Sequence, residues 1–249
     1  GKTAIVEGLA YRMQMNDMPN ALKGYSVYKI STPSLIGTTD GENKVVALVN
    51  ELKGMDKVII FIDEIHMLIG ARGEGPMDLA NMLKEGLSRG TVKLIGATTV
   101  DEYERYILRD KAFVRRFERI DISEPTQEMC VQILMRTLPK IEIQTGVRLN
   151  YTNFIKEKIM KFIVNMTSEY KRVYEIFSRY PDIALTLLRQ AFSAALFDNK
   201  QEVSFKHIYE AIKNTKAVYP DVIKKELVVF KNEFKDELLA EGVSIEIPE

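Results

Sequence analysis

The stretch Val58-Ile-Ile-Phe-Ile-Asp63-Glu64 decides how this chain folds. Its first five residues are apolar and β-branched or aromatic without interruption, a pattern typical of a strand covered on both faces, as in parallel α/β sheets. Two carboxylates follow directly. Charged groups at the tip of a buried strand cost desolvation free energy unless something uses them. Asp63 and Glu64 are therefore candidate functional residues, the alternative being an ordinary solvated strand end.

Helical and extended patterns alternate on both sides of this strand. Apolar residues recur at helical spacing in three segments, 4–13, 45–52 and 78–88. Strand patterns occupy 26–30, 92–97 (a second buried strand) and, more weakly, 119–122. Alternation of this kind predicts an α/β fold with a parallel sheet.

The pattern changes after Glu124-Pro125, and the remainder reads as helical. Thr126 is a plausible N-cap, and further helices are predicted over 154–166, 181–197 and from Pro220 onward. We therefore expect three parts: an α/β subdomain (1–124), an all-helical lid subdomain (125–216) and a C-terminal helix or linker (217–249).

The last 30 residues begin with a helix over 220–240, which we expect to pack against the rest of the chain as a terminal helix. Residues 243–247 alternate like a strand, which would need a partner strand.

Composition excludes several classes of function. The 249 residues carry 35 basic and 35 acidic side chains, whereas a general nucleic-acid coat or a binder of anionic membranes is normally basic. A single cysteine excludes an internal disulfide framework and suits a reducing compartment, so we expect a cytoplasmic protein. Two histidines leave little for a histidine-rich metal centre. Apolar runs fall short of the ~20 residues that span a bilayer.

The first residues resemble part of a phosphate-binding loop. Gly1-Lys2-Thr3 before a helix matches the end of the pattern G-x-x-x-x-G-K-[ST], in which backbone N–H groups and the helix N-terminus cradle phosphates. Lys2 would neutralise the β- and γ-phosphates, and Thr3 would ligate Mg²⁺. In a nucleotide hydrolase, Asp63 would hold Mg²⁺ through water, and Glu64 would polarise the attacking water. Three residues also recur by chance, so an ordinary helix start is the alternative.

Two further groups are weaker on their own. Thr98 and Thr99 end the strand pattern over 92–97, where a hydroxyl could lie near the γ-phosphate. Arg115 and Arg116 could stabilise transition-state charge as arginine fingers. A plain strand end and a solvated arginine pair are the alternatives.

Six segments in register resemble the first ATPase module of the Clp-type AAA+ protein unfoldases. They are GKTAIVEGLAYR (1–12), LKGYSVYKI (22–30), VIIFIDEIHMLIGA (58–71), MDLANMLKEGLSRG (77–90), LIGATTVDEYERYI (94–107) and KAFVRRFERI (111–120). The resemblance covers most of residues 1–125, is thinner in the helical half and is poor over 198–249. It implies an AAA+ P-loop subdomain followed by a helical lid, with ATP and Mg²⁺ as ligands.

The resemblance also implies a role for each matching residue. Gly1, Lys2 and Thr3 would bind phosphate, with Thr3 and Asp63 at Mg²⁺. Glu64 would be the catalytic base. The second threonine of the Gly-Ala-Thr-Thr segment, Thr99, would be the sensor residue.

The resemblance also implies roles for residues outside the phosphate- and magnesium-binding group. Arg115 and Arg116 would act in trans on ATP held by a neighbouring subunit, which requires a homo-oligomeric ring, usually a hexamer. Asp182 would lie where the lid approaches the nucleotide. A sensor arginine at Arg189 is a weaker possibility, because the family's first module usually lacks one.

The chain departs from the family pattern in three places. Residues 140–180 are too few for the long coiled-coil middle domain of the disaggregase kind. The helix over 220–240 could be the stump of that domain or a linker to a second ring, although we favour a packed terminal helix. The family's threading loop carries an aromatic residue between basic residues, whereas residues 34–42 contain none. A ring ATPase is therefore better supported than polypeptide threading. The family's first strand and first loop glycines would precede Gly1. We expect the natural chain to extend upstream and the stretch as given to bind nucleotide poorly.

The leading hypothesis is an ATP-driven ring that remodels or unfolds protein substrates, with a protease as a possible partner. The alternatives are a nucleotide-gated scaffold and a nucleic-acid-associated loader, and neutral charge argues against the loader. Three residues are expected to be structural: His66 through local hydrogen bonds, His207 on the surface and Cys130 in a core.

Overall fold

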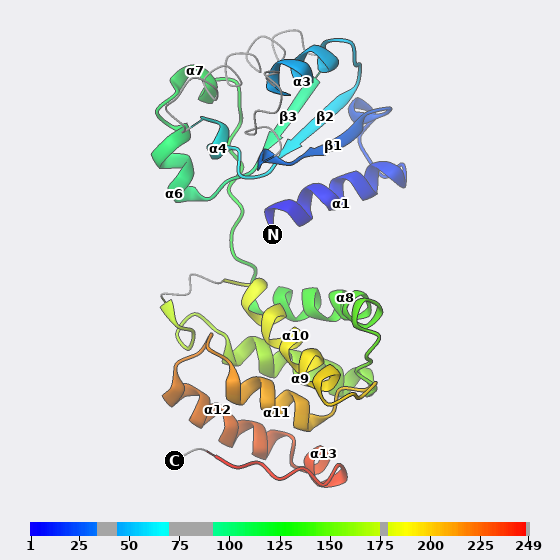
Figure 1. Cartoon of the computed structure of the whole chain (residues 1–249), viewed down its shortest axis with the longest axis vertical. Helices are drawn as coiled ribbons and strands as arrows, with labels where there is room; N and C mark the ends of the chain where they lie inside the picture. Colours follow the sequence, from blue (N-terminus) through cyan, green and yellow to red (C-terminus); the bar gives the residue numbers. More distant parts are fainter. Residues whose placement is uncertain (34–43, 70–91, 175–178, 248–249) are drawn as a thin grey trace. The chain divides into compact units, whose positions relative to one another are not determined.

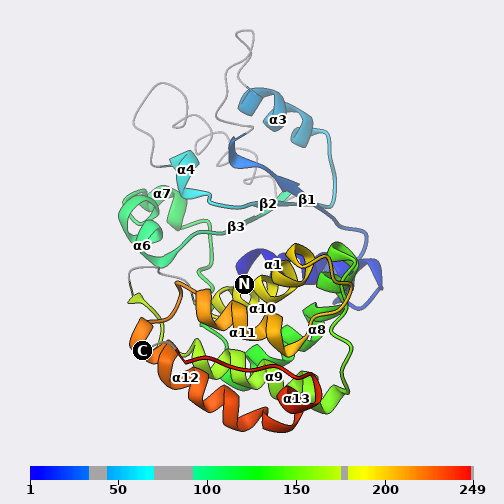
Figure 2. The same cartoon turned by 60° about the horizontal axis from the view of Figure 1, so that its bottom comes forward.

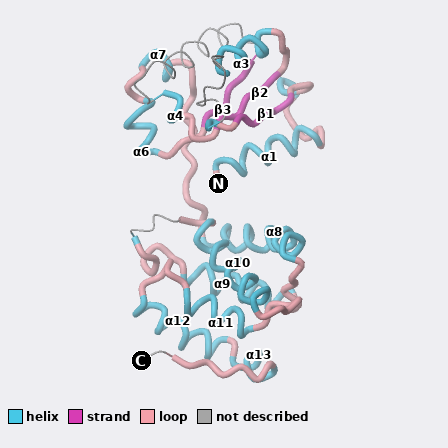
Figure 3. Tube along the Cα trace, viewed as in Figure 1, coloured by secondary structure: helices cyan, strands magenta, loops and turns pink. Residues whose placement is uncertain are grey.

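The computed structural model describes residues 1–33, 44–69, 92–174 and 179–247 (Figure 1). Contacts divide the chain into two compact units, Gly1–Ile122 and Ser123–Glu249. Among the described residues, all three strands belong to the first unit, and the second is helical (Figure 3). In these residues no helix is both long and apolar enough to cross a bilayer.

The first unit is built on a parallel sheet. Its strands are β1 (Ser26–Ile30), β2 (Val58–Ile62) and β3 (Val92–Gly96), hydrogen-bonded in the order β1-β2-β3. Ile60 of β2 is paired with Tyr28 on one side and Leu94 on the other. Every residue of β2 is buried. The parallel α/β sheet and the doubly covered central strand predicted from the sequence are confirmed.

Side chains of β2 alternate between two apolar clusters. Ile60 belongs to a cluster that includes Leu52 of α3 (Lys44–Lys53) and Leu68 of α4 (His66–Ile69). Phe61 belongs to another, with Val6 of α1 (Lys2–Gln14). Helices α1 and α3 accordingly lie on opposite sides of the sheet (Figure 1). This two-sided cover explains why β2 is continuously apolar.

Two strand predictions need correction. Strand β3, predicted as a second buried strand, lies at the edge of the sheet that the described residues form. Its Leu94 and Ile95 are only partly buried. The predicted strand over 119–122 is wrong, since these residues join no strand and Ile120 is 78% exposed. An apolar alternation becomes a strand only where a neighbouring backbone can hydrogen-bond to it.

The remaining elements of this unit are short. They are a 3₁₀ turn (Asn20–Leu22), α6 (Val100–Glu102), a π-helical turn (Tyr103–Ile107) and α7 (Lys111–Val114). The helix predicted over 78–88 lies outside the described residues.

The second unit consists of six helices in its described part. They are α8 (Gln127–Thr145), α9 (Asn153–Met166), α10 (Asp182–Phe197), α11 (Phe205–Asn214), α12 (Pro220–Glu233) and α13 (Lys235–Ala240). Thr126 caps α8 by accepting a 3.3 Å hydrogen bond from the Met129 N–H. The predicted N-cap and the helices expected over 154–166, 181–197 and from Pro220 are confirmed.

The C-terminal helix is a packed part of this unit. Phe230 and Phe234 are fully buried, their ring centroids are 5.0 Å apart, and both contact Phe162 of α9 and Phe205 of α11. The favoured interpretation, a packed terminal helix, is confirmed.

The segment after α13 runs back alongside α12 (Figure 2). It is not a strand, contrary to the expectation for 243–247. Ile245 is buried, and the Tyr209 hydroxyl donates a 2.7 Å hydrogen bond to the Glu246 carbonyl. The alternation therefore reflects one buried residue between exposed neighbours and not a β-ladder.

Two residues expected to be structural differ in outcome. Cys130 is fully buried, as predicted, and burial raises the pKa of its thiol to about 12. The surface position predicted for His207 is wrong, because this residue is 4% exposed. Its Nδ1 accepts a 2.9 Å hydrogen bond from the Ser204 N–H, and burial lowers its pKa. Ser204 and His207 form a capping box at the start of α11, which gives the buried imidazole a hydrogen-bond partner.

Candidate functional site

The N-terminus of α1 meets the tip of β2. Gly1 is the N-cap of α1, and Lys2 and Thr3 are its first residues. The Thr3 hydroxyl donates a 2.7 Å hydrogen bond to Asp63 Oδ2, joining positions 60 residues apart. The structure thus brings together the Gly-Lys-Thr segment and the carboxylates after β2.

Asp63 is held on more than one side. Its Oδ1 accepts a 3.1 Å hydrogen bond from the Glu64 N–H. Its carbonyl oxygen accepts a short hydrogen bond from the hydroxyl of Thr32, a buried residue two positions after β1. Thr32 was not predicted as a site residue. The sequence feature that could have indicated it is a hydroxyl side chain just after β1, the strand paired with β2.

Glu64 has an unusual backbone conformation and a perturbed side chain. Its φ of 51° lies in the left-handed region, which few residues other than glycine adopt. Partial burial raises the pKa of its carboxyl, the negative charge of Glu102 adds to this, and the nearby His66 and Lys2 oppose it. A carboxylate whose pKa is raised toward neutrality is a stronger proton acceptor. This suits Glu64 to accept a proton from water.

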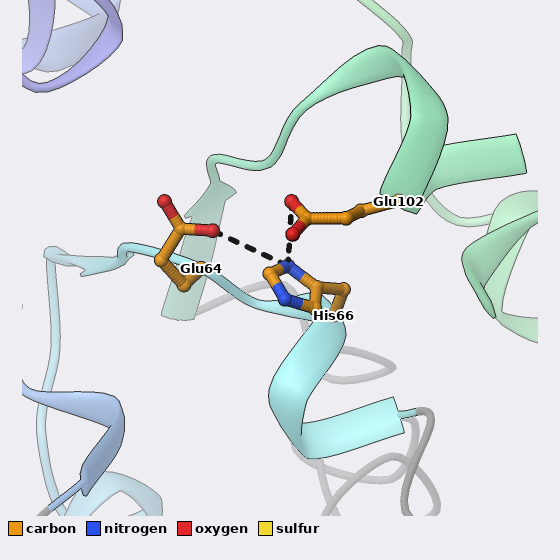
Figure 4. A group of neighbouring side chains, drawn as sticks. All are labelled: Glu64, His66 and Glu102. Atoms are coloured by element: carbon orange, nitrogen blue, oxygen red, sulfur yellow. Dashed lines mark ion pairs between the residues drawn. The ribbon is translucent and has the colours of Figure 1, made fainter. Parts of the chain in front are cut away.

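His66 links Glu64 to the segment that follows β3 (Figure 4). Its Nδ1 is 2.9 Å from the Thr98 hydroxyl, 3.2 Å from Glu102 Oε2 and 3.4 Å from Glu64 Oε2. Its ring stacks on Tyr106 at a centroid distance of 5.9 Å. The local hydrogen bonding predicted for His66 is confirmed.

The two threonines after β3 have different contacts. Thr99 forms the capping box of α6: its hydroxyl accepts from the Glu102 N–H at 3.3 Å and donates to Glu102 Oε2 at 2.8 Å. It is the hydroxyl of Thr98 that lies against His66. The family resemblance points to Thr99. Glu102 was not predicted as a site residue, although Thr-x-x-Glu is a readable capping-box pattern.

The other predicted site residues lie away from this cluster in sequence and are exposed. Arg115 and Arg116 follow α7, and the N–H of Arg116 bonds to the Phe113 carbonyl at 3.0 Å. Asp182 is the first residue of α10 in the second unit, and Arg189 lies on the same helix. The altered threading loop, 34–42, lies outside the described residues.

Thr3 and Asp63 fit a magnesium ion. Both offer oxygen donors, the type that Mg²⁺ prefers. Oxygen ligands on adjacent corners of a Mg²⁺ octahedron are about 2.9 Å apart, given metal–oxygen distances of 2.0–2.1 Å. The 2.7 Å between Thr3 Oγ1 and Asp63 Oδ2 is close to that separation.

Comparison with known proteins finds similarity to an ATPase family and to chaperones. Residues 1–121 match the ATPase family associated with various cellular activities (AAA). The chaperone protein ClpB of Aquifex aeolicus is 39% identical over 196 residues, which cover 77% of this chain and 18% of that protein. ClpB of Bacteroides thetaiotaomicron is 40% identical over 202 residues, covering 77% and 22%. The matched stretch is thus about a fifth of each relative's length.

Solved structures extend the similarity to nearly the whole chain. A closed-state structure of Hsp104 with ATPγS and FITC-casein is 29% identical, with a TM-score of 0.70, and the match covers 98% of this chain and 45% of that one. The Saccharomyces cerevisiae Hsp104–ADP complex is 30% identical, with a TM-score of 0.70 and coverage of 96% and 41%. The structural similarity therefore includes the helical unit, where the sequence resemblance is thin.

Proposed function

Residues 1–121 belong to the AAA family of ATPases, and on that premise we propose that this chain is the ATP-binding and ATP-hydrolysing module of a Clp-like protein-remodelling machine. One observation carries the proposal. The Thr3 hydroxyl is 2.7 Å from Asp63 Oδ2, so a phosphate-binding helix start and a carboxylate pair meet at one point of the sheet.

Nucleotide binding is assigned to the start of α1. Gly1 and the first N–H groups of the helix receive phosphate oxygens, and the Lys2 ammonium neutralises their charge. Thr3 and Asp63 would hold Mg²⁺ through their side-chain oxygen atoms. When bound, Mg²⁺ neutralises phosphate charge and polarises phosphate oxygens.

Hydrolysis is assigned to Glu64. Its carboxylate accepts a proton from the attacking water, aided by the raised pKa of this group. A hydroxyl after β3 orients the water or the γ-phosphate. Sequence resemblance favours Thr99 for this role, whereas the contact with His66 favours Thr98.

Under this proposal the active form is a homo-oligomeric ring. Arg115 and Arg116 of one subunit reach ATP bound by the neighbouring subunit. Their exposure is compatible with that role. Asp182 would approach the nucleotide from the lid. By similarity to ClpB and to the Hsp104 structure with casein, the substrates are proteins. The cytoplasm is the site of action that the single cysteine suggests. A protease partner stays a hypothesis from sequence.

The test is ATP turnover against protein concentration. Glu64→Gln should bind ATP with nearly unchanged affinity and lose turnover by about 10²–10⁴-fold, because the general base is gone. The matched control is Glu104→Gln, an exposed glutamate outside the site. Equal turnover in Glu64→Gln and the parent would contradict the assignment of the base.

Dependence on concentration separates the candidate functions. Specific activity that rises with concentration supports fingers acting in trans. ATP binding without turnover at any concentration would favour the nucleotide-gated scaffold.

A further inference from the structure

Glu64, His66 and Glu102 direct three potential metal ligands at one point. Glu64 lies in the turn after β2, His66 is the first residue of α4, and Glu102 is the last residue of α6 (Figure 4). Each offers one ligand atom, and the three atoms lie within 4.8 Å of one another. No other group of this kind occurs in the described parts of the chain.

Distances within the cluster match those around a small tetrahedral cation. Zinc–nitrogen and zinc–oxygen bonds of about 2.0–2.2 Å place adjacent ligand atoms about 3.3–3.5 Å apart. His66 Nδ1 is 3.4 Å from Glu64 Oε2 and 3.2 Å from Glu102 Oε2. The side chains of Glu64 and Glu102 are 47% and 33% exposed. Small rotations of these side chains can therefore adjust the distance between their carboxylate oxygens.

Hydrogen-bond capacity also favours a cation. His66 Nδ1 faces three oxygens, those of Glu64, Glu102 and Thr98, but an imidazole nitrogen carries at most one proton. Glu102 Oε2 also accepts hydrogen bonds from the Thr98 and Thr99 hydroxyls. Both carboxylates nevertheless face the same nitrogen, and their negative charges repel each other. A divalent cation bound by the nitrogen lone pair would offset this repulsion.

We propose that Glu64, His66 and Glu102 form a binding site for a first-row divalent transition-metal ion, with Zn²⁺ as the best fit. The imidazole donor separates this site from one for Mg²⁺, which prefers oxygen ligands only. Neighbouring contacts orient the ligands: Tyr106 stacks on the His66 ring, and the hydroxyls of Thr98 and Thr99 bond to Glu102 Oε2. Such supporting contacts commonly tune metal affinity.

Metal binding would have a consequence that rests on the proposed function. A cation held by the Glu64 carboxylate occupies the lone pairs that would accept a proton from water. Zn²⁺ would then inhibit ATP turnover reversibly without displacing the nucleotide. Binding itself does not depend on whether the chain hydrolyses ATP.

The experiment is calorimetric titration of the full chain with Zn²⁺, at neutral pH, in millimolar Mg²⁺ and without nucleotide. We expect one ion per chain, and affinity weaker by at least about tenfold in His66→Ala and in Glu102→Gln. Glu102→Gln is the sharper variant, because glutamine still serves a capping box. Glu104→Gln is the matched control and should bind Zn²⁺ like the parent.

The composition of the chain keeps the result simple to interpret. The only other histidine, His207, and the only cysteine, Cys130, are both buried. Parent-like affinity in both folded variants, the absence of a titratable site, or displacement of Zn²⁺ by Mg²⁺ would each overturn the proposal. Because no ATP is present, these outcomes are independent of the turnover experiment.

Discussion

The two units bury their apolar residues in different ways. In the second unit, buried side chains from α8 to α13 form one continuous core. In the first unit they form two separate clusters on opposite faces of the sheet. The candidate site lies where β2 ends, and polar contacts fix its geometry there. The helical unit is therefore stabilised by one large apolar core. In the α/β unit, packing on both faces of the sheet fixes β2, and the polar groups of the site gather where that strand ends.

The largest expected effect is in the aromatic centre of the helical unit. Phe234→Ala should lower the free energy of unfolding by about 3–5 kcal/mol, because it leaves a cavity among Phe162, Phe205 and Phe230. Hydrogen exchange should show lost amide protection in α9, α11 and α12, while β2 keeps its protection.

The control for this experiment is Phe197→Ala, since Phe197 is 88% exposed and its removal should change stability little. Equal loss of amide protection in β2 and in α9 would show that the two units unfold together. That result would contradict the view that each unit is stabilised by its own core.

A smaller effect is expected at the edge strand of the α/β unit. A Cβ at Gly96 would lie 2.8 Å from Ile65 Cδ1 and 3.1 Å from its Cγ2. Gly96→Ala should therefore cost about 1–3 kcal/mol through overpacking, measured by chemical denaturation. Because Ile65 lies between Glu64 and His66, Zn²⁺ affinity should also fall. Gly8→Ala is the matched control: Gly8 is in α1 with open space around it, so alanine should stabilise or be neutral.

An ion pair in the helical unit should make its stability depend on pH. Arg172 donates to both oxygens of Glu124, at 2.6 and 3.2 Å, and the Tyr180 N–H donates at 2.8 Å. Burial alone would raise the pKa of Glu124, but these hydrogen bonds outweigh it and the pKa is lowered. The stabilisation is thus complete above the unfolded pKa of about 4.3 and is lost as pH falls through the lower folded pKa.

Glu124→Gln should cost about 1–2 kcal/mol at neutral pH and flatten the acid side of the stability curve. The measurement is the free energy of unfolding from pH 7 to pH 3. A curve parallel to that of the parent would exclude Glu124 as a source of the pH dependence.

The smallest effects are expected at helix caps, one in each unit. Thr99→Ala removes the cap of α6, and Thr152→Ala removes that of α9, where Thr152 accepts from the Ile155 N–H at 3.4 Å. Each should cost about 1 kcal/mol in urea denaturation. A much larger loss of ATP turnover in Thr99→Ala than in Thr98→Ala would support the sensor role that the sequence resemblance gives to Thr99.

Local patterns predicted most of the secondary structure of the described residues. Five consecutive apolar residues identified β2, and 3.6-residue periodicity identified α9, α10 and α12. The failures, at 119–122 and 243–247, were short alternating segments. Their conformation depends on whether another strand is available, which local periodicity cannot show. His207 was misplaced because one histidine on a helix gives no periodic signal of burial.

The sequence by itself determined the kinds of chemistry available: a phosphate-loop lysine and threonine, two carboxylates after a buried strand, and threonines after the next. Tertiary structure decided which of these groups meet. Thr3 reaches Asp63 across 60 positions, Thr98 and not Thr99 contacts His66, and Glu102 joins them from α6. The physical reason is that such contacts depend on the register of parallel strands and on how α1 packs against the sheet. Both are set by pairing between distant segments, whereas a sequence pattern reports only the neighbours of each residue along the chain.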